Sequence, residues 1–520
     1  MKFRFFKLTT TIIILSCVNA YAQQEAVDTA VFSRIRKAEL SSSQIPRLAY
    51  YLTDVSGPRL TASPGYQRAS NWAIAEMKKW GLVNAGLESW GEFGKQWEIR
   101  DFNITMKAPY NQLIAGYPEP WGANTNGPVK GDVIILTRAQ SRDTVYLKAH
   151  AALLKGKFLL NPGPPLSAAD ISGPVTSRLS DAELANMGDT FMVPDSLIKS
   201  FPALFKKGAR ISQIKKEIGI LGVIYSTVYS ANGHILAQTN EGFKLAAPSM
   251  LPAVSIGIED AQKMKRLIES GIRVSLEVNI KGEFSTADTR GYNVIAEIPG
   301  SDPKLKSQVV MLGGHLDSWE AATGATDNAA GCIVMMEAVR LLDSLHLKPK
   351  RTIRIALWGG EEQGVLGSYG YVKNHFRDRT TLRVKPEQAN ISAYFNLDNG
   401  TGKIRGIYTQ NNTAVQPIFE QWLKPFHDLG ATTVTTKNTG STDHIAFDWA
   451  GIPGFEFIQD PLDYETRTHH TNLDTYDHLA LDDLKQAAII VASFVYQASM
   501  RPELLPRKPL VADSFPYDGF

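Results

Sequence analysis

Residues 308–358 have the sequence QVVMLGGHLDSWEAATGATDNAAGCIVMMEAVRLLDSLHLKPKRTIRIALW, and this stretch gives the strongest indication of the fold. The apolar run 308–312 predicts a buried strand, and 352–358 predicts a second strand with alternating apolar side chains. Between them, residues 328–345 repeat apolar side chains at helical spacing along one face. A strand, a helix and a strand in this order indicate a parallel pair joined by a crossover helix.

The same alternation continues on both sides of this unit. Residues 292–298, 391–397 and 454–458 have the composition of strands, and 367–376 has that of a helix. Strands that alternate with helices favour a sheet covered by helices on both faces. We therefore predict an α/β fold with a mixed, mostly parallel sheet.

The chain of 520 residues is too long for one ordinary core, so two or three domains are expected. After residue 127 the sequence pattern changes to short β-like runs separated by turns rich in proline and glycine. This pattern indicates a separate β-rich domain inserted into the first domain. The predicted organisation is a leader (1–22), the first part of the main domain (23–127), the inserted domain (128–284) and the second part of the main domain (285–520).

The first 22 residues have the parts of a secretory signal peptide. A basic start precedes an apolar run at 8–18, and Ala20-Tyr21-Ala22 provides a small-residue cleavage site. We predict an exported protein, periplasmic or extracellular, cleaved near Ala22. A lipoprotein with Cys17 as the lipidated residue is the alternative. Cleavage leaves Cys332 as a single thiol, which excludes an intrachain disulfide.

Composition excludes some partners. No run after the leader reaches the roughly 20 apolar residues of a membrane span, so none is expected. The net charge of +3 gives no electrostatic reason to expect nucleic acid or an anionic membrane as partner.

Acidic and imidazole side chains follow the predicted strands directly. Because ligands of open α/β sheets lie outside the carboxyl ends of the strands, these side chains are expected to meet at one edge. The group consists of His315 and Asp317 after the first strand, Glu361 and Glu362 after 352–358, Asp398 after 391–397, His470 after 454–458, and Asp327 just before the helix.

Imidazoles and carboxylates together form a nitrogen and oxygen ligand set that suits zinc, manganese or cobalt. So many carboxylates at one edge would repel one another unless cations lay between them, which favours two divalent ions, most simply Zn²⁺. Two such ions about 3.5–4 Å apart can hold a shared hydroxide and polarise a carbonyl oxygen. A carboxylate such as Asp327 can bridge them with one oxygen each.

Five short motifs resemble those of one enzyme family. They are His315-Leu316-Asp317-Ser318, Thr326-Asp327-Asn328-Ala329-Ala330-Gly331, Gly360-Glu361-Glu362-Gln363-Gly364, Asn396-Leu397-Asp398 and His470-Thr471-Asn472-Leu473-Asp474-Thr475. In order, spacing and context they resemble the co-catalytic zinc aminopeptidases, a metallopeptidase family that also contains the glutamate carboxypeptidases. Residues 52–60, 293–300 and 314–319 are most similar to its plasma glutamate carboxypeptidase branch. The inserted segment resembles the protease-associated domain that many of these enzymes carry.

The resemblance implies a role for each residue of the group. The metal ligands would be His315 and Asp398 on one ion, Glu362 and His470 on the other, and Asp327 between them.

The remaining roles implied by the resemblance are catalytic or supporting. Glu361 would be the general base, and Asp317 would accept the second N–H of His315. A cis peptide bond is expected after Asp327. His444, in a loop similar to the family's substrate-side loop, would be a donor to the oxyanion. His469 stands where some members have a tyrosine, so an oxyanion role there stays open.

The expected function is a secreted two-zinc exopeptidase that hydrolyses dipeptides or short peptides, of carboxypeptidase or dipeptidase type. An aminopeptidase with the same metal core is the near alternative. A receptor-like module without catalysis, or a hydrolase or cyclase acting on non-peptide amides, are the more distant ones. The resemblance also suggests a homodimer.

Overall fold

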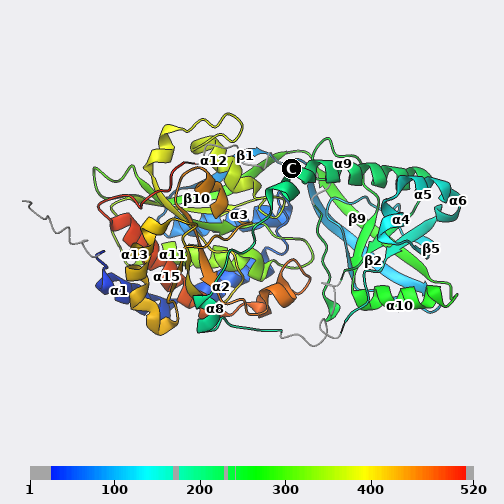
Figure 1. Cartoon of the computed structure of the whole chain (residues 1–520), viewed down its shortest axis with the longest axis horizontal. Coiled ribbons are helices and arrows are strands. Elements are labelled where there is room, and N and C mark those ends of the chain that lie inside the picture. The colour runs from blue at the N-terminus through cyan, green and yellow to red at the C-terminus, as the bar shows by residue number, and fades with distance from the viewer. Residues whose placement is uncertain (1–24, 168–174, 228–231, 240–241, 511–520) are drawn as a thin grey trace, which may run out of the picture.

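The computed structural model describes residues 25–167, 175–227, 232–239 and 242–510. The predicted leader 1–22 and the alternative Cys17 lie outside these residues. Figure 1 shows two lobes side by side, each built on its own sheet.

The first lobe is built on an eight-stranded mixed sheet. Its central strands β12, β11, β13 and β16 are parallel neighbours, whereas β1, β10 and β14 pair antiparallel. In spatial order the strands are β1 (Val83–Glu92), β10 (Arg290–Ile298), β12 (Thr352–Trp358), β11 (Val309–His315), β13 (Ile391–Asn396), β16 (Gly454–Gln459), β14 (Ile404–Tyr408) and β15 (Thr433–Thr435).

Helices cover both faces of this sheet. One face packs in a large apolar core against α1 (Thr29–Ser42), α2 (Ile45–Tyr50), α3 (Pro64–Lys79), α11 (Ala330–Ser344), α13 (Gln416–Leu423) and α15 (Leu481–Met500). The other face packs against α12 (Leu366–His375) and α14 (His444–Trp449). The side chains of the parallel strands therefore alternate between two buried layers, as the apolar runs predict.

Short helical segments lie at the turns of the first lobe. They are the π-helical turns Tyr51–Val55, Ala325–Ala329 and Tyr464–Thr468, and the 3₁₀ turns Pro386–Asn390, Thr413–Val415, Lys424–Leu429 and Tyr476–His478. The peptide bond between Asp327 and Asn328 is cis, as the resemblance implies.

The second lobe contains another eight-stranded sheet. In spatial order its strands are β3 (Gln112–Leu113), β2 (Gln96–Ala108), β9 (Ser275–Ser285), β5 (Val129–Ile135), β6 (Lys157–Asn161), β7 (Gly222–Tyr225), β8 (Ala253–Ile256) and β4 (Gly116–Pro118). Its helices are α4 (Arg138–Arg142), α5 (Thr144–Ala149), α6 (Ala151–Leu154), α9 (Asp195–Ile218) and α10 (Ile258–Glu269); the short α8 (Asp181–Ala185) lies against the first lobe (Figure 1).

The second sheet begins earlier in the chain than residue 128, where the inserted segment is expected to start. It already includes β2, β3 and β4. Strand β2 is easily missed in the sequence because most of its side chains are only partly buried and it contains no continuous apolar run. Among the described residues, no helix is long and apolar enough to cross a membrane.

Candidate metal centre

The central parallel strands of the first sheet carry the predicted site residues at their carboxyl ends. His315 is the last residue of β11 and pairs with Trp358, the last residue of β12. Gly359 and Gly360 then turn the chain toward Glu361. Gly360 has a positive φ of 75°, and a Cβ on Gly359 would lie 2.4 Å from the Tyr66 hydroxyl. This turn therefore requires glycine at both positions.

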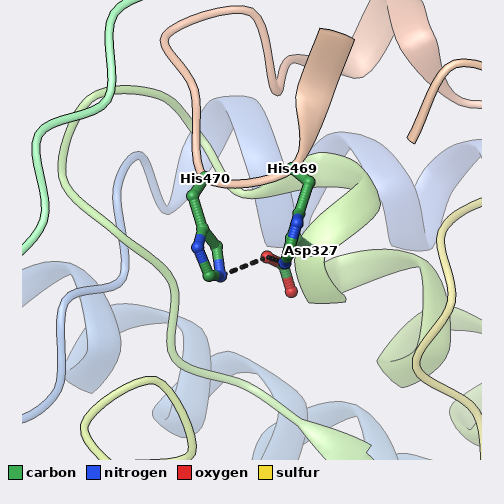
Figure 2. Close-up of side chains that lie close together, drawn as sticks. All are labelled: Asp327, His469 and His470. Atoms are coloured by element: carbon green, nitrogen blue, oxygen red, sulfur yellow. Dashed lines mark ion pairs between the residues drawn. The ribbon is translucent and has the colours of Figure 1, made fainter. Parts of the chain in front are cut away.

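Asp327 lies at the middle of the cluster. The Nε2 atom of His315 lies 3.1 Å from Asp327 Oδ1, and the Nε2 atom of His470 lies 3.2 Å from Asp327 Oδ2. Each imidazole thus faces a different oxygen of one carboxylate. Figure 2 shows His469 and His470 together beside Asp327, and His470 joined to it by the dashed line.

Each imidazole also faces a second carboxylate. His315 Nε2 is 3.2 Å from Asp398 Oδ1, and His470 Nε2 is 3.0 Å from Glu362 Oε2. The five predicted metal ligands therefore come together as two histidine-carboxylate pairs that share Asp327. Distances alone group them in the same way as the resemblance does.

Glu361 lies next to the first pair. Its Oε2 atom is 4.0 Å from His315 Nε2, farther than either carboxylate that contacts this nitrogen. Glu361 and Glu362 are neighbours in sequence, but their carboxylates approach different histidines. Only one of the two glutamates is thus in close contact with an imidazole.

Asp317 connects His315 to the turn that carries the two glutamates. The resemblance implies that its carboxylate accepts the second N–H of His315. Instead, His315 Nδ1 lies 3.0 Å from the backbone oxygen of Asp317 and 3.7 Å from its carboxylate. That carboxylate accepts hydrogen bonds from the backbone N–H groups of Glu361 and Glu362 and from the Thr61 hydroxyl. Asp317 therefore orients both the ring and the turn, through different atoms.

Two further buried acids support the cluster from behind. Asp474 accepts hydrogen bonds from the backbone N–H groups of Thr326 and Asp327, at 2.6 and 3.1 Å. Glu456 accepts one from the backbone N–H of Asp398, at 2.8 Å. No role was predicted for either acid, although Asp474 belongs to one of the quoted motifs. Glu456 lies inside an apolar strand, where nothing in the sequence distinguishes it.

Arg59 fixes the loop between His315 and Asp327. Its guanidinium is fully buried and donates to the backbone carbonyls of Leu316 at 2.7 Å, Leu52 at 3.0 Å and Gly324 at 2.8 Å, and to that of Thr323. A buried cation that donates only to carbonyl oxygens is held by geometry that a lysine does not reproduce. The quoted stretch 52–60 includes Arg59, but no sequence pattern predicts a role for it.

We expect Arg59→Met to lower the free energy of unfolding by about 3 kcal/mol or more, because it leaves several buried carbonyls without a donor. Urea denaturation monitored by tryptophan fluorescence measures this effect. Arg68→Met is the matched control, since Arg68 is exposed and, within the described residues, donates only to the carbonyl of Ser56. Equal losses in the two variants would contradict a special role for Arg59.

The cluster has a strong excess of negative charge. Burial, reinforced by Asp398, raises the pKa of Glu361 well above its usual range, and burial with Asp327 nearby also raises the pKa of Glu362. Burial alone would raise the pKa of Asp327 too, but the close imidazoles of His315 and His470 hold it well below its usual value. Conversely, burial opposes the charging of both imidazoles, yet the carboxylates raise their pKa values well above normal.

The donor set fits divalent cations. Asp327 Oδ2 and Glu362 Oε1 are buried and have no hydrogen-bond partner among the described residues. Ligand atoms of His315, Asp327 and Glu362, and separately those of Asp327, His469 and His470, lie within 4.8 Å of one another. Neutral imidazoles and ionised carboxylates are the usual zinc ligands, and cations between them would remove the repulsion described above.

His444 lies away from the open side of this cluster. It is fully buried, and its Nε2 contacts the Thr439 carbonyl at 3.0 Å and the side chain of Gln410. Its Nδ1 faces Glu456 at 3.5 Å, and burial lowers its pKa to about 4. Because both ring nitrogens face protein groups, the geometry gives no support to His444 as a donor to the oxyanion.

His469 lies closer to the cluster than the sequence indicates. Its Nε2 is 3.8 Å from Asp327 Oδ2, its ring lies 3.9 Å from that of His470, and about a third of its side chain is exposed. Its Nδ1 is 3.6 Å from Glu465. His469 and His470, with 34% and 25% of their side chains exposed, therefore both border the cluster and solvent, whereas His315 is buried.

A set of histidines and carboxylates at the carboxyl ends of parallel strands is typical of a metal-dependent hydrolase, and the similarities below identify its class as metallopeptidase. Residues 293–495 match the model of Peptidase family M28, and the five predicted metal ligands all lie within this range. The prediction of an enzyme that hydrolyses peptide bonds is confirmed.

Similarity to named proteins extends over nearly the whole chain. The chain is 27% identical to Carboxypeptidase Q of Pongo abelii over 98% of its own length and 100% of that protein. It is 28% identical to Carboxypeptidase Q of Homo sapiens over 88% of its own length and 85% of that protein. These relatives confirm the branch of the family that the sequence resembles.

Solved structures confirm the α/β fold class. The peptidase M28 precursor from Shewanella amazonensis SB2B superposes with a TM-score of 0.66 at 23% identity, over 93% of this chain and 99% of that one. A zinc aminopeptidase from Bacillus subtilis superposes with a TM-score of 0.56 at 19% identity, over 91% of this chain and 98% of that one. At these identities the likeness concerns the fold alone.

Proposed function

We propose that this chain is an exported exopeptidase that uses two zinc ions to hydrolyse dipeptides or short peptides, of carboxypeptidase or dipeptidase type. The observation that carries the proposal is the shared Asp327, whose two oxygens lie 3.1 and 3.2 Å from two different imidazoles. A single structural ion would not require two histidine-carboxylate pairs on opposite oxygens of one acid. The relatives named Carboxypeptidase Q support the peptide specificity.

In this proposal five residues hold the ions. When bound, two divalent cations polarise the peptide carbonyl and make water acidic enough to attack it at neutral pH. The ligands are His315 and Asp398 for one ion, His470 and Glu362 for the other, and Asp327 for both.

The chain's own residues then move the proton. Glu361 is near the ligands but is not in close contact with either imidazole, which leaves its carboxylate available as the general base. It takes a proton from the attacking water and delivers it to the leaving amine. Asp317 positions this base, because its carboxylate accepts hydrogen bonds from the backbone N–H groups of Glu361 and Glu362.

Metal removal provides a first test. Because the ions bind the folded chain and not the unfolded one, about 4 kcal/mol of stability is expected at a free ion concentration near 1,000 times Kd. We therefore expect chelation with EDTA to abolish activity and to lower Tm by several degrees, and added zinc to restore both. Two equivalents of zinc per chain by elemental analysis would support the proposal; one or none would contradict the two-ion centre.

The direction of exopeptidase action is the next question. An aminopeptidase with the same metal core is the second candidate, and the zinc aminopeptidase among the structural neighbours is the observation that favours it. The two differ in whether the pocket recognises an α-carboxylate or an α-ammonium. Assays of a free dipeptide beside its N-acetylated and C-amidated forms separate them. Loss of turnover on C-amidation alone supports a carboxypeptidase, and loss on N-acetylation alone supports an aminopeptidase.

More distant functions are tested by the same panel. A hydrolase or cyclase of non-peptide amides would turn over N-acyl substrates but no free peptide. A receptor-like module would turn over neither; the close grouping of the five proposed ligands with the proposed base speaks against it.

The inserted segment is proposed to be a protease-associated domain that limits access to the centre. Its residue Ile235 forms two hydrogen bonds with Asn472, two residues after His470: its N–H donates to the side-chain Oδ1 of Asn472 at 2.7 Å, and its carbonyl accepts from the Asn472 backbone N–H at 3.2 Å. Export with cleavage near Ala22 is part of the same proposal, and N-terminal sequencing of the mature protein tests it. Gel filtration with light scattering tests the suggested homodimer.

A further inference from the structure

The inserted lobe contains a cavity of about 870 Å³ that is separate from the metal centre. It lies at the carboxyl ends of the parallel strands β5, β6 and β7 and is lined there by Leu136, Asn161 and Tyr225. Ligands of open α/β sheets bind outside such strand ends, and cavities of roughly 300–1,000 Å³ suit small organic molecules. None of the proposed metal ligands lines this cavity.

A buried lysine with no acidic partner lines the cavity. Lys215 of α9 is only 5% exposed, and its Nζ donates to the Ser141 hydroxyl at 3.0 Å. Within the described part of the chain, no carboxylate forms an ion pair with it. Burial and the nearby charge of Arg142 lower the pKa of Lys215 to about 8. An ammonium buried without a counter-ion is unfavourable unless an anion completes the site.

The other charged groups on the cavity wall are also mostly cationic. Arg138 and Arg142 line it from α4, and neither forms an ion pair within the described residues. The single acid on the wall, Glu269, is 3.9 Å from the ammonium of Lys265, which lines the same cavity. The wall therefore carries a net positive charge.

A neutral donor and an apolar wall complete the cavity. The Ser226 side chain is 5% exposed, and its Oγ has no hydrogen-bond partner among the described residues. The adjacent loop is held in place by Gln262, which donates to the carbonyls of Pro162 and Gly163. The apolar part of the wall consists of Ile135, Leu136, Ile211, Val223, Met250 and Leu251.

We propose that this cavity binds a small organic oxyanion with an apolar body. Lys215 and Arg142 supply the positive charge, Ser226 supplies a hydroxyl donor, and the aliphatic wall accepts the body of the ligand. A carboxylate and a phosphate ester both have this chemistry. This site does not share residues with the metal centre, so the proposal can be tested independently of the proposed peptidase function.

Isothermal titration of the metal-loaded enzyme tests this site with two anionic probes, 4-methylpentanoate and phenyl phosphate, and the neutral 4-methylpentanamide. We expect at least one anion to bind and the amide not to bind. Lys215→Met is expected to raise Kd about tenfold or more, and Arg142→Gln several-fold. Lys148→Gln, an exposed change on α5 outside this cavity, is the matched control and leaves Kd unchanged.

The outcomes separate the sources of the anion and the alternative site. Binding of 4-methylpentanoate alone assigns a carboxylate ligand, and binding of phenyl phosphate alone assigns a phosphate ester. Binding that survives Lys215→Met and Arg142→Gln but is lost on chelation locates the anion at the metal centre and overturns the proposal. Absence of binding by both anions at 10 mM, a concentration on the order of the weakest specific affinities, also overturns it. Because Lys215→Met removes a buried charge, it should not impair folding, and Arg142 is exposed.

Discussion

The Glu361→Gln variant is expected to bind as much metal as the unchanged enzyme and to lose about 10³-fold in kcat. The substitution keeps the size of the side chain but removes the group that accepts a proton, and general acid-base catalysis contributes about 10²–10⁴-fold. The ligands are unaffected in this variant, since His315 faces Asp327 and Asp398 at shorter distances than Glu361. Stopped assays on a dipeptide give kcat, and elemental analysis of the same sample gives the metal content.

The neighbouring residue provides the control for this experiment. Glu362 lies 3.0 Å from His470 Nε2, so Glu362→Gln should reduce the zinc content as well as the turnover. Two isosteric changes at adjacent positions are thus expected to differ in metal content. If Glu361→Gln also loses metal, Glu361 is a ligand and the assignment of the base is wrong.

The carboxyl ends of strands explain why so much of the centre could be predicted from the sequence. His315, Glu361 and Asp398 each follow a short apolar run, and parallel strands bring such positions to one edge. Each of these side chains lies within three residues of the end of its run. His470 follows its strand after a longer loop, and only the motif around it predicts that it returns to the same edge.

The supporting residues could not be predicted in the same way. Arg59, Asp474 and Glu456 act through backbone groups of other segments, and such contacts leave no periodic pattern in the sequence. A local pattern also failed for β2, whose partner β9 lies more than 150 residues later in the chain. Pairing between distant strands depends on the tertiary structure. The composition of a half-exposed strand therefore gives little indication that it is a strand or which strand it pairs with.

The largest effect on metal binding is expected for Asp327→Asn. The amide keeps the shape of the carboxylate but offers only one acceptor oxygen, and its NH₂ group faces the place of a cation. Because the two oxygens of Asp327 face His315 and His470, both ion sites should weaken together. We expect the zinc content to fall from about two ions to well below one per chain, and kcat/KM to fall about 10³-fold or more.

Asp398→Asn is the matched control, because Asp398 contacts His315 and has no contact with His470 among the described residues. It should weaken one ion site and leave the pair formed by His470 and Glu362 able to bind the other. Elemental analysis and zinc titration of both variants therefore distinguish a residue that binds both ions from a residue that binds only one. If Asp327→Asn loses one ion only, as Asp398→Asn is expected to do, Asp327 does not bridge. The two histidine-carboxylate pairs would then be independent sites, and the shared carboxylate on which the two-ion mechanism depends would be ruled out.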